Sequence, residues 1–339
     1  MTKEMLNLLL QAVGAAPQLL ILTHNNPDPD AIASGVALRY LLTEQLNVDS
    51  QIVYQGLVGR AENKALVRYL VHPLRTLTAS DLTAGLPLAL VDTHPGAGNT
   101  VPLPAGARLA IVIDHHTAVT VPAAVIPDFS DIRPELGATS TILTDYLQAA
   151  NLEPPAPLAT ALFYGIKTNT MGLGRNTNPA DAAAYHYLQP RIDVKGLADI
   201  EHARVPAQYF KSFDVALRAA QVYDGVLISY LGAVNYPDLT AEMADLLLRL
   251  EEAEWVICMG VHDQHLMISI RLHRGQRGAG QLAQAIVGSD GAAGGHGTIA
   301  GGQIPLAGKS PEELVAQVIG RILSHLNLSP ELAGRLLFE

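Results

Sequence analysis

Residues 18–42 read QLLILTHNNPDPDAIASGVALRYLL, in which a short apolar run leads through a polar turn into a segment of helical character at 31–46. The same pattern continues through the first half of the chain. Apolar runs lie at 51–55, 86–92, 107–114 and 119–126, and further helical segments lie at 62–71, 140–150 and 157–170. Near-continuous apolar strands that alternate with helices predict an α/β fold with a parallel sheet covered on both faces.

Side chains that can carry chemistry follow three of these strands. His24, Asp92 and Asp114 each lie where an apolar run ends. In an open parallel sheet, ligands bind beyond the carboxyl ends of the strands, so we expect these residues at one edge. Asp28 and Asp30 lie close to His24 in the sequence. Two carboxylates so near each other repel unless a cation joins them.

The donor types indicate which cation this is. His115 and His116 directly follow Asp114. Oxygen-rich sites with imidazoles suit Mg²⁺ or Mn²⁺, and Mn²⁺ is favoured as imidazoles are added. A strand-end carboxylate such as Asp92 can bridge two ions. Two ions ~3.5–4 Å apart can generate hydroxide and hold both the attacking and the leaving oxygen of a phosphate ester.

Each motif alone also has a plainer interpretation. Asp-Pro-Asp at 28–30 is often only a turn and a helix N-cap, and a lone Asp-His-His tripeptide carries little information. Their joint occurrence, each after an apolar strand of one sheet, favours a metal site.

Composition limits the possible partners. The chain has 339 residues, enough for two domains, and no apolar run approaches the ~20 residues of a membrane span, so we expect a soluble protein without a membrane partner. The formal net charge of −10 argues against binding of long duplex DNA but permits a nucleotide or a short oligonucleotide. Cys258 is the only cysteine, so an intrachain disulfide is excluded and a cytoplasmic location is expected.

The second half of the chain has a different pattern, typical of an α+β domain. Strands are expected at 223–232, 255–261 and 265–273, a glycine-rich loop and strand at 294–306, and helices at 239–254, 278–288 and 310–327. The intervening helical segment 178–213 is interrupted by prolines. We therefore expect a metal-binding domain at 1–190, a helical connector at 191–220 and a smaller domain at 221–339. The apolar face of 140–164 either covers the sheet or pairs with a second subunit in a homodimer.

Five segments, in chain order, resemble motifs of a known superfamily. HNNPDPDAIASG (24–35), VDTHP (91–95), IDHH (113–116) and GIKTNT (165–170) look like those of the DHH phosphoesterases, and GGHGTIAGG (294–302) resembles the signature of the partner DHHA1 domain. The similarity is greatest to the RecJ-like group that includes nano-RNase/pAp phosphatases and exopolyphosphatase-related proteins. It implies an N-terminal parallel-sheet DHH domain, a smaller α+β DHHA1 domain and an active site in the cleft between them.

The resemblance also implies a role for each matching residue in the first domain. One ion is expected at His24, Asp28 and Asp92. A second is expected at Asp30, Asp92, His115 and residue 169. Asp114 is expected to orient a histidine, and His116 to face the substrate phosphate.

In the second domain, the resemblance implies that Arg271 and the turn of Gly294, Gly295 and His296 hold the far phosphate or the terminal nucleotide. Consecutive glycines let backbone N–H groups converge on an anion, and arginine offers a bidentate fork. Taken alone, the glycine-rich segment is a plain flexible loop and 271–277 a solvated hairpin end.

Asn169 departs from the superfamily pattern, which has an aspartate there. An amide oxygen can ligate a hard cation, but it lacks the full negative charge. Three alternatives are open: a natural site that works with a weakened second metal, a protein that has lost catalysis and kept binding, or a residue changed deliberately to slow hydrolysis. A compensating role for Asp181 is conceivable but disfavoured.

Two classes of function are compatible with these residues. The first is a two-metal phosphoesterase that hydrolyses very short RNA or pAp, with exopolyphosphatase or pyrophosphatase activity disfavoured by the scarcity of lysine and arginine. The second is a catalytically weakened or inactive nucleotide-binding protein, which Asn169 favours. Retention of five of the six expected ligands favours the enzyme.

Overall fold

The computed structural model describes residues 3–83, 85–117, 126–273, 278–329 and 331–338. The chain divides into two compact units, Met1–Ala203 and Arg204–Glu339. The helices of the expected 191–220 connector are shared between them. α8 (Val194–Glu201) belongs to the first unit, and α9 (Ala207–Arg218) belongs to the second.

The first unit is built on a six-stranded sheet whose pairs are all parallel, as predicted. Its order is β3-β2-β1-β4-β5-β6. The strands are β1 (Gln18–Thr23), β2 (Asp49–Tyr54), β3 (Leu74–Thr76), β4 (Leu88–Val91), β5 (Leu109–Asp114) and β6 (Phe129–Ile132). The strand expected at 119–126 falls almost wholly outside the described residues. This order makes β1, β4 and β5 neighbours, so their carboxyl ends lie side by side.

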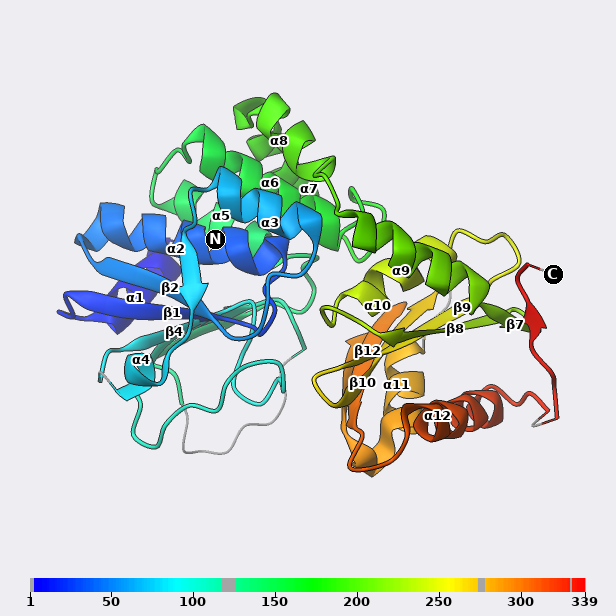
Figure 1. Ribbon diagram of the computed structural model, residues 1–339. Coiled ribbons are helices and arrows are strands. Elements are labelled where there is room, and N and C mark those ends of the chain that lie inside the picture. The colour runs from blue at the N-terminus through cyan, green and yellow to red at the C-terminus, as the bar shows by residue number, and fades with distance from the viewer. Residues whose placement is uncertain (1–2, 84, 118–125, 274–277, 330, 339) are drawn as a thin grey trace. The chain divides into compact units, whose positions relative to one another are not determined.

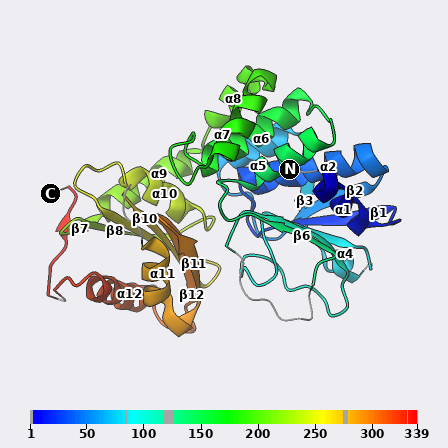
Figure 2. The same ribbon diagram turned by 180° about the vertical axis from the view of Figure 1, so that it is seen from behind.

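Helices cover the two faces of this sheet unequally (Figures 1 and 2). One face packs against most of the helices in a large core, which includes Ile21 and Ile113. The other buries Leu20 and Leu90 against α4 and loop segments. The helices are α1 (Lys3–Val13), α2 (Pro29–Leu46), α3 (Ala61–Tyr69), α4 (Ala79–Thr83), α5 (Thr139–Ala149), α6 (Ala156–Asn169), α7 (Pro179–Leu188) and α8, with a 3₁₀ turn at Gln189–Arg191. Both faces are therefore covered, but only one of them by long helices.

The apolar sides of α5 and α6 lie within the larger core. Ile142, Tyr146 and Leu162 are fully buried there. The apolar face predicted for 140–164 therefore covers the sheet and its helices.

α6 packs closely on the start of α2 and on α5. A Cβ on Gly165 would lie 2.5 Å from the Ser140 hydroxyl oxygen and 3.1 Å from the Asp30 Cα. Only glycine permits this approach without displacement of the neighbours. The approach brings the last residue of α6, Asn169, to the first turn of α2.

The second unit contains a mixed seven-stranded sheet in the order β11-β12-β10-β9-β8-β7-β13. Its strands are β7 (Gln221–Tyr223), β8 (Val226–Ala233), β9 (Trp255–His262), β10 (His265–Leu272), β11 (Ala292–His296), β12 (Ile299–Pro305) and β13 (Arg335–Leu336). One face packs against α9 and α10 (Leu239–Leu247), the other against α11 (Ala279–Val287) and α12 (Pro311–His325), and a 3₁₀ turn spans Gly288–Asp290. The expected α+β architecture is confirmed.

Two expected elements of this unit have different bounds. The strand predicted at 223–232 is interrupted by a turn, because Asp224 and Gly225 both have positive φ, 47° and 80°. The helix predicted at 239–254 ends at Leu247. Glu251 and Glu252 follow, and acidic side chains are unfavourable at the negative end of a helix.

Across the described residues of both units, each helix is too short or too polar to cross a membrane.

Candidate metal centre

Three neighbouring strands bring the predicted residues to one edge of the first sheet. His24 follows β1, Asp92 follows β4, and Asp114 is the last residue of β5. Because β1, β4 and β5 are adjacent and parallel, their carboxyl ends present these side chains together.

The first group consists of His24, Asp28 and Asp92. Nε2 of His24 lies 3.7 Å from Oδ1 of Asp28 and 3.5 Å from Oδ2 of Asp92. Nδ1 of the same ring is 2.8 Å from the Asn25 carbonyl oxygen, to which it can only donate. This leaves Nε2 directed at the two carboxylates, and in the neutral ring this nitrogen is the one that can bind a metal ion. The arrangement suits a divalent cation.

Asp28 also caps α2. Its Oδ1 accepts the N–H groups of Asp30 at 2.9 Å and Ala31 at 3.0 Å, and Pro29 occupies the first helical turn. The plain N-cap interpretation of Asp-Pro-Asp is therefore correct, yet the same carboxylate faces His24. Burial raises the pKa of Asp28, but the imidazole and the helix N–H groups outweigh it, so the pKa lies well below its ordinary value. A carboxylate held in its charged form is suited to bind a cation.

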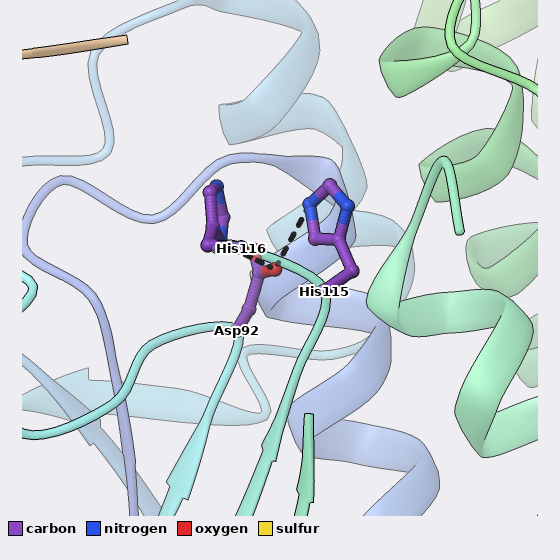
Figure 3. Close-up of side chains that lie close together, drawn as sticks. All are labelled: Asp92, His115 and His116. Atoms are coloured by element: carbon purple, nitrogen blue, oxygen red, sulfur yellow. Dashed lines mark ion pairs between the residues drawn. The ribbon is translucent and has the colours of Figure 1, made fainter. Parts of the chain in front are cut away.

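Asp92 occupies the centre of the site with an unusual backbone. Its φ of 60° is left-handed, a conformation that aspartate tolerates better than most residues. Oδ2 faces His24, whereas Oδ1 lies 3.7 Å from Nε2 of His115 and 3.8 Å from Nδ1 of His116. Figure 3 shows both imidazoles beside the Asp92 carboxylate. One carboxylate thus faces His24 with one oxygen and both His115 and His116 with the other, the position in which the predicted bridging ligand would lie.

The second predicted ligand set converges, but with a different pattern of contacts. Nε2 of His115 lies 3.9 Å from Oδ2 of Asp30, and its Nδ1 is 3.1 Å from the Leu136 carbonyl, to which it can only donate. Asp30 is fully buried, and Nδ2 of Asn169 donates to its Oδ2 at 2.8 Å. Burial raises the pKa of Asp30 well above its ordinary value, and the charges of Asp92 and Asp28 raise it further. Clustered carboxylates of this kind are stabilised by a cation.

Asp114 lies behind the two groups. It is completely buried, and its Oδ1 accepts the ring Nδ1 of His116 at 2.8 Å and the backbone N–H of that residue at 3.1 Å. Its Oδ2 lies 2.5 Å from Nδ1 of His94. Burial lowers the pKa of His116, but the hydrogen bond that His116 donates to Asp114 and the charge of Asp92 outweigh it and raise that pKa to about 9. His94 was not among the site residues predicted from the sequence, although it follows Asp92 by two residues at a strand end.

The first turn of α5 also contributes to the site and was not predicted from the sequence. The backbone N–H groups of Thr139 and Ser140 donate to Asp30 at 2.8 and 2.7 Å, and the Thr139 hydroxyl donates to Oδ1 of Asp92 at 2.8 Å. A helix N-terminus stabilises negative charge. The only signal in the sequence was the cluster of hydroxyl residues that begins this helix.

Asp181, considered as a compensating ligand, has a structural role. It is fully buried and accepts hydrogen bonds from the Gly137 N–H at 2.9 Å, the Thr141 hydroxyl at 2.6 Å and the Asn178 N–H at 2.9 Å. The last contact belongs to a capping box at the start of α7. Asp181 therefore anchors the segment that leads into α5.

In the second unit, the proposed substrate-binding residues share one end of the sheet. Arg271 on β10 pairs with Ile299 of β12, which pairs in turn with His296 of β11. Nε of Arg271 is 2.5 Å from Oδ1 of Asp245, and its Nη1 donates to the Ile270 carbonyl at 3.1 Å. The predicted phosphate ligand therefore already has a carboxylate partner.

The glycines of this segment differ in their surroundings. A Cβ on Gly294 would meet nothing within 4 Å, whereas one on Gly295, whose φ is 146°, would lie 2.4 Å from Ala300. The side chain of His296 lies outside the described part of the structure. The backbone of Gly294 is thus accessible to a bound group.

The sequence is similar to proteins of other organisms. An uncharacterized protein of Methanocaldococcus jannaschii is 37% identical over 289 residues, which cover 85% of this chain and 58% of that protein, so the chain spans less than two thirds of this relative. A probable manganese-dependent inorganic pyrophosphatase of Streptococcus agalactiae is 22% identical over 269 residues, covering 74% of this chain and 82% of that protein.

A solved exopolyphosphatase-related protein from Bacteroides fragilis has a similar fold. Its TM-score is 0.75 at 15% identity, and the match covers 96% of this chain and 97% of that one. Residues 18–166, which include His24, Asp28 and Asp92, match the DHH family, N-terminal domain. The chain therefore contains an N-terminal domain of the DHH family.

Proposed function

We propose that this chain is a metal-dependent phosphoesterase that hydrolyses short nucleotides or oligonucleotides. The observation that carries the proposal is the paired arrangement around Asp92. One of its oxygens faces His24 and the other faces His115. Each of these rings commits Nδ1 to a backbone carbonyl and directs Nε2 toward carboxylates. Such an arrangement has no evident structural purpose, because uncompensated buried carboxylates destabilise a fold.

The donor set fits divalent cations, and Mn²⁺ is our proposed ion because imidazole is present among hard oxygen donors. His24, Asp28 and Asp92 would hold the first ion, and Asp30, Asp92 and His115 belong to the second position. When bound, such ions supply a Lewis acid and activate water for attack on phosphorus.

His116 is the proposed contact for the substrate phosphate. Its side chain is 35% exposed, whereas Asp114 behind it is completely buried. The two hydrogen bonds from His116 to Asp114 fix the ring orientation. Asp114 thus acts as a positioning residue, and the exposed edge of the imidazole is left to donate to a phosphate oxygen.

The substrate class is inferred from charge and from the second unit. The net charge of −10 suits a small substrate better than a long polyanion. Arg271 and the open backbone at Gly294 are the proposed ligands for a second phosphate or a terminal nucleotide. Very short RNA and pAp are the leading candidates. Inorganic pyrophosphate is the second candidate, favoured by the alignment with a probable manganese-dependent pyrophosphatase.

Direct hydrolysis assays test this proposal. The chain, Asn169→Asp and the inactive control Asp92→Asn would be incubated with Mn²⁺ and a 5′-labelled dinucleotide, pAp or pyrophosphate. We expect hydrolysis of one nucleotide substrate by the unchanged chain, faster hydrolysis by Asn169→Asp, and none by Asp92→Asn. Turnover of pyrophosphate alone would favour the second candidate. Binding of the nucleotides without turnover by either active form would contradict the proposal and support a binding protein.

A further inference from the structure

The carboxylate of Asp30 has little capacity left to bind an ion. Its Oδ2 accepts the Thr139 N–H and Nδ2 of Asn169, both at 2.8 Å. Its Oδ1 accepts the Ser140 N–H at 2.7 Å and faces the Ser34 hydroxyl at 3.4 Å. A carboxylate oxygen offers about two lone-pair positions, so both positions on Oδ2 are filled.

Oδ2 is also the oxygen that a second ion would need. It lies 3.9 Å from Nε2 of His115, the ring nitrogen whose lone pair faces the site. Nδ2 of Asn169 lies 3.5 Å from the same nitrogen. The amide NH₂ therefore occupies the space between Asp30 and His115, and it presents hydrogens, which repel a cation.

Rotation of the amide would not reopen this position easily. A turn of 180° would place the Asn169 carbonyl oxygen against Oδ2 of Asp30, so that two acceptors face each other. The hydrogen bond from the amide N–H to Oδ2 would be lost, and an unmade hydrogen bond in a buried position costs free energy. An aspartate at 169 would instead favour an ion in this position, because two facing carboxylates repel each other unless a cation lies between them.

The first group differs because, among the described residues, no side-chain amide donates into it and one oxygen of Asp28 accepts neither cap hydrogen bond. Nε2 of His24 lies 3.5 Å from Oδ2 of Asp92 and 3.7 Å from Oδ1 of Asp28. The cap hydrogen bonds fill Oδ1 of Asp28 and leave its Oδ2 for an ion. We infer that the chain binds one divalent ion tightly at this group, while the Asn169 amide keeps the second position, at Asp30, Asp92 and His115, closed. The inference rests on the metal centre of the proposed function and is independent of the substrate.

Metal uptake tests this inference without any activity assay. Chelator-treated protein would be dialysed against increasing Mn²⁺, bound manganese would be counted by mass spectrometry, and its EPR spectrum recorded. We expect one tight ion in the unchanged chain, a second bound roughly 100-fold more weakly, and a mononuclear spectrum. Asn169→Asp is expected to take up two ions of similar affinity with an exchange-coupled spectrum. Asn151→Asp, which adds the same charge at an exposed position of the same unit, is the matched control.

A thermal measurement provides a second readout. Metal-free Asn169→Asp should melt at a lower temperature than the unchanged chain, because it buries a further carboxylate beside Asp30. Added Mn²⁺ should raise the melting temperature of this variant by more than that of the unchanged chain. Two ions of equal affinity in the unchanged chain would overturn the inference, whether or not the variant folds. So would a single ion in a folded Asn169→Asp. Absence of any bound ion would instead refute the proposed metal centre.

Discussion

Asp181 offers a test of how the fold supports the metal centre from outside it. The variant Asp181→Ala removes three hydrogen bonds from a fully buried carboxylate. The Gly137 N–H is buried and cannot move to another partner, the Thr141 hydroxyl can rotate, and the Asn178 N–H is part-buried. Unsatisfied buried donors cost roughly 1–3 kcal/mol each, so we expect a total loss of about 4 kcal/mol.

The control Asp181→Asn has the same shape and one remaining oxygen. It keeps neutral hydrogen bonds in place of charge-assisted ones, so a loss of about 1–2 kcal/mol is expected. Both variants should still bind a metal ion at the first group, because the contacts of Asp181 are made to Gly137, Thr141 and Asn178.

Urea unfolding measures these losses. Far-UV circular dichroism reports on both units, and with an m-value of about 2 kcal/mol/M the alanine variant should lose about 2 M in midpoint. Trp255, the only tryptophan, lies in β9 of the second unit, so its fluorescence separates that unit from the first. A loss below about 1 kcal/mol in the alanine variant would refute the anchoring role. Lower metal uptake by Asp181→Asn at unchanged stability would show that Asp181 is a ligand after all.

Three further changes test other contacts. His94→Ala, which removes a donor 2.5 Å from Asp114, should lower kcat roughly 10- to 100-fold at unchanged metal uptake. His94→Asn should restore part of the lost kcat. An equal loss of metal uptake in both variants would contradict a positioning role. Gly165→Ala should lower the free energy of unfolding by about 1–3 kcal/mol in thermal melts, because its Cβ would meet Ser140. The control Gly320→Ala meets nothing within 4 Å and should be neutral or stabilising. Equal effects of the two variants would refute the close approach of α6. Asp245→Asn weakens the contact that orients Arg271, so it should raise KM about tenfold at unchanged kcat. An unchanged KM would count against Arg271 as a phosphate ligand.

Much of the first unit could be predicted because the signals are local. Each strand is a short apolar run, and a parallel sheet places the ends of such runs at a common edge, so His24, Asp92 and Asp114 could be grouped without coordinates. The same logic could not show that the helices favour one face, since both faces of such strands are equally apolar.

The remaining contacts depend on pairs that are distant in sequence. Nothing local indicates that Asn169 donates to Asp30, because that contact requires α6 to approach α2 at Gly165. The partner of Arg271 could not be predicted either, because Asp245 lies on a helix whose predicted end was itself wrong. The hydroxyl residues at the start of α5 became meaningful only when their N–H groups were seen to face Asp30.

The left-handed backbone of Asp92 limits which residues can replace it during evolution. At a φ of 60°, alanine or glutamate would add backbone strain of about 1–2 kcal/mol to the loss of a ligand, whereas asparagine and glycine are tolerated. Homologues that abandon metal chemistry should therefore carry asparagine or glycine here. A survey of this position across descendants of the fold would separate inactive lineages from active ones without a single assay.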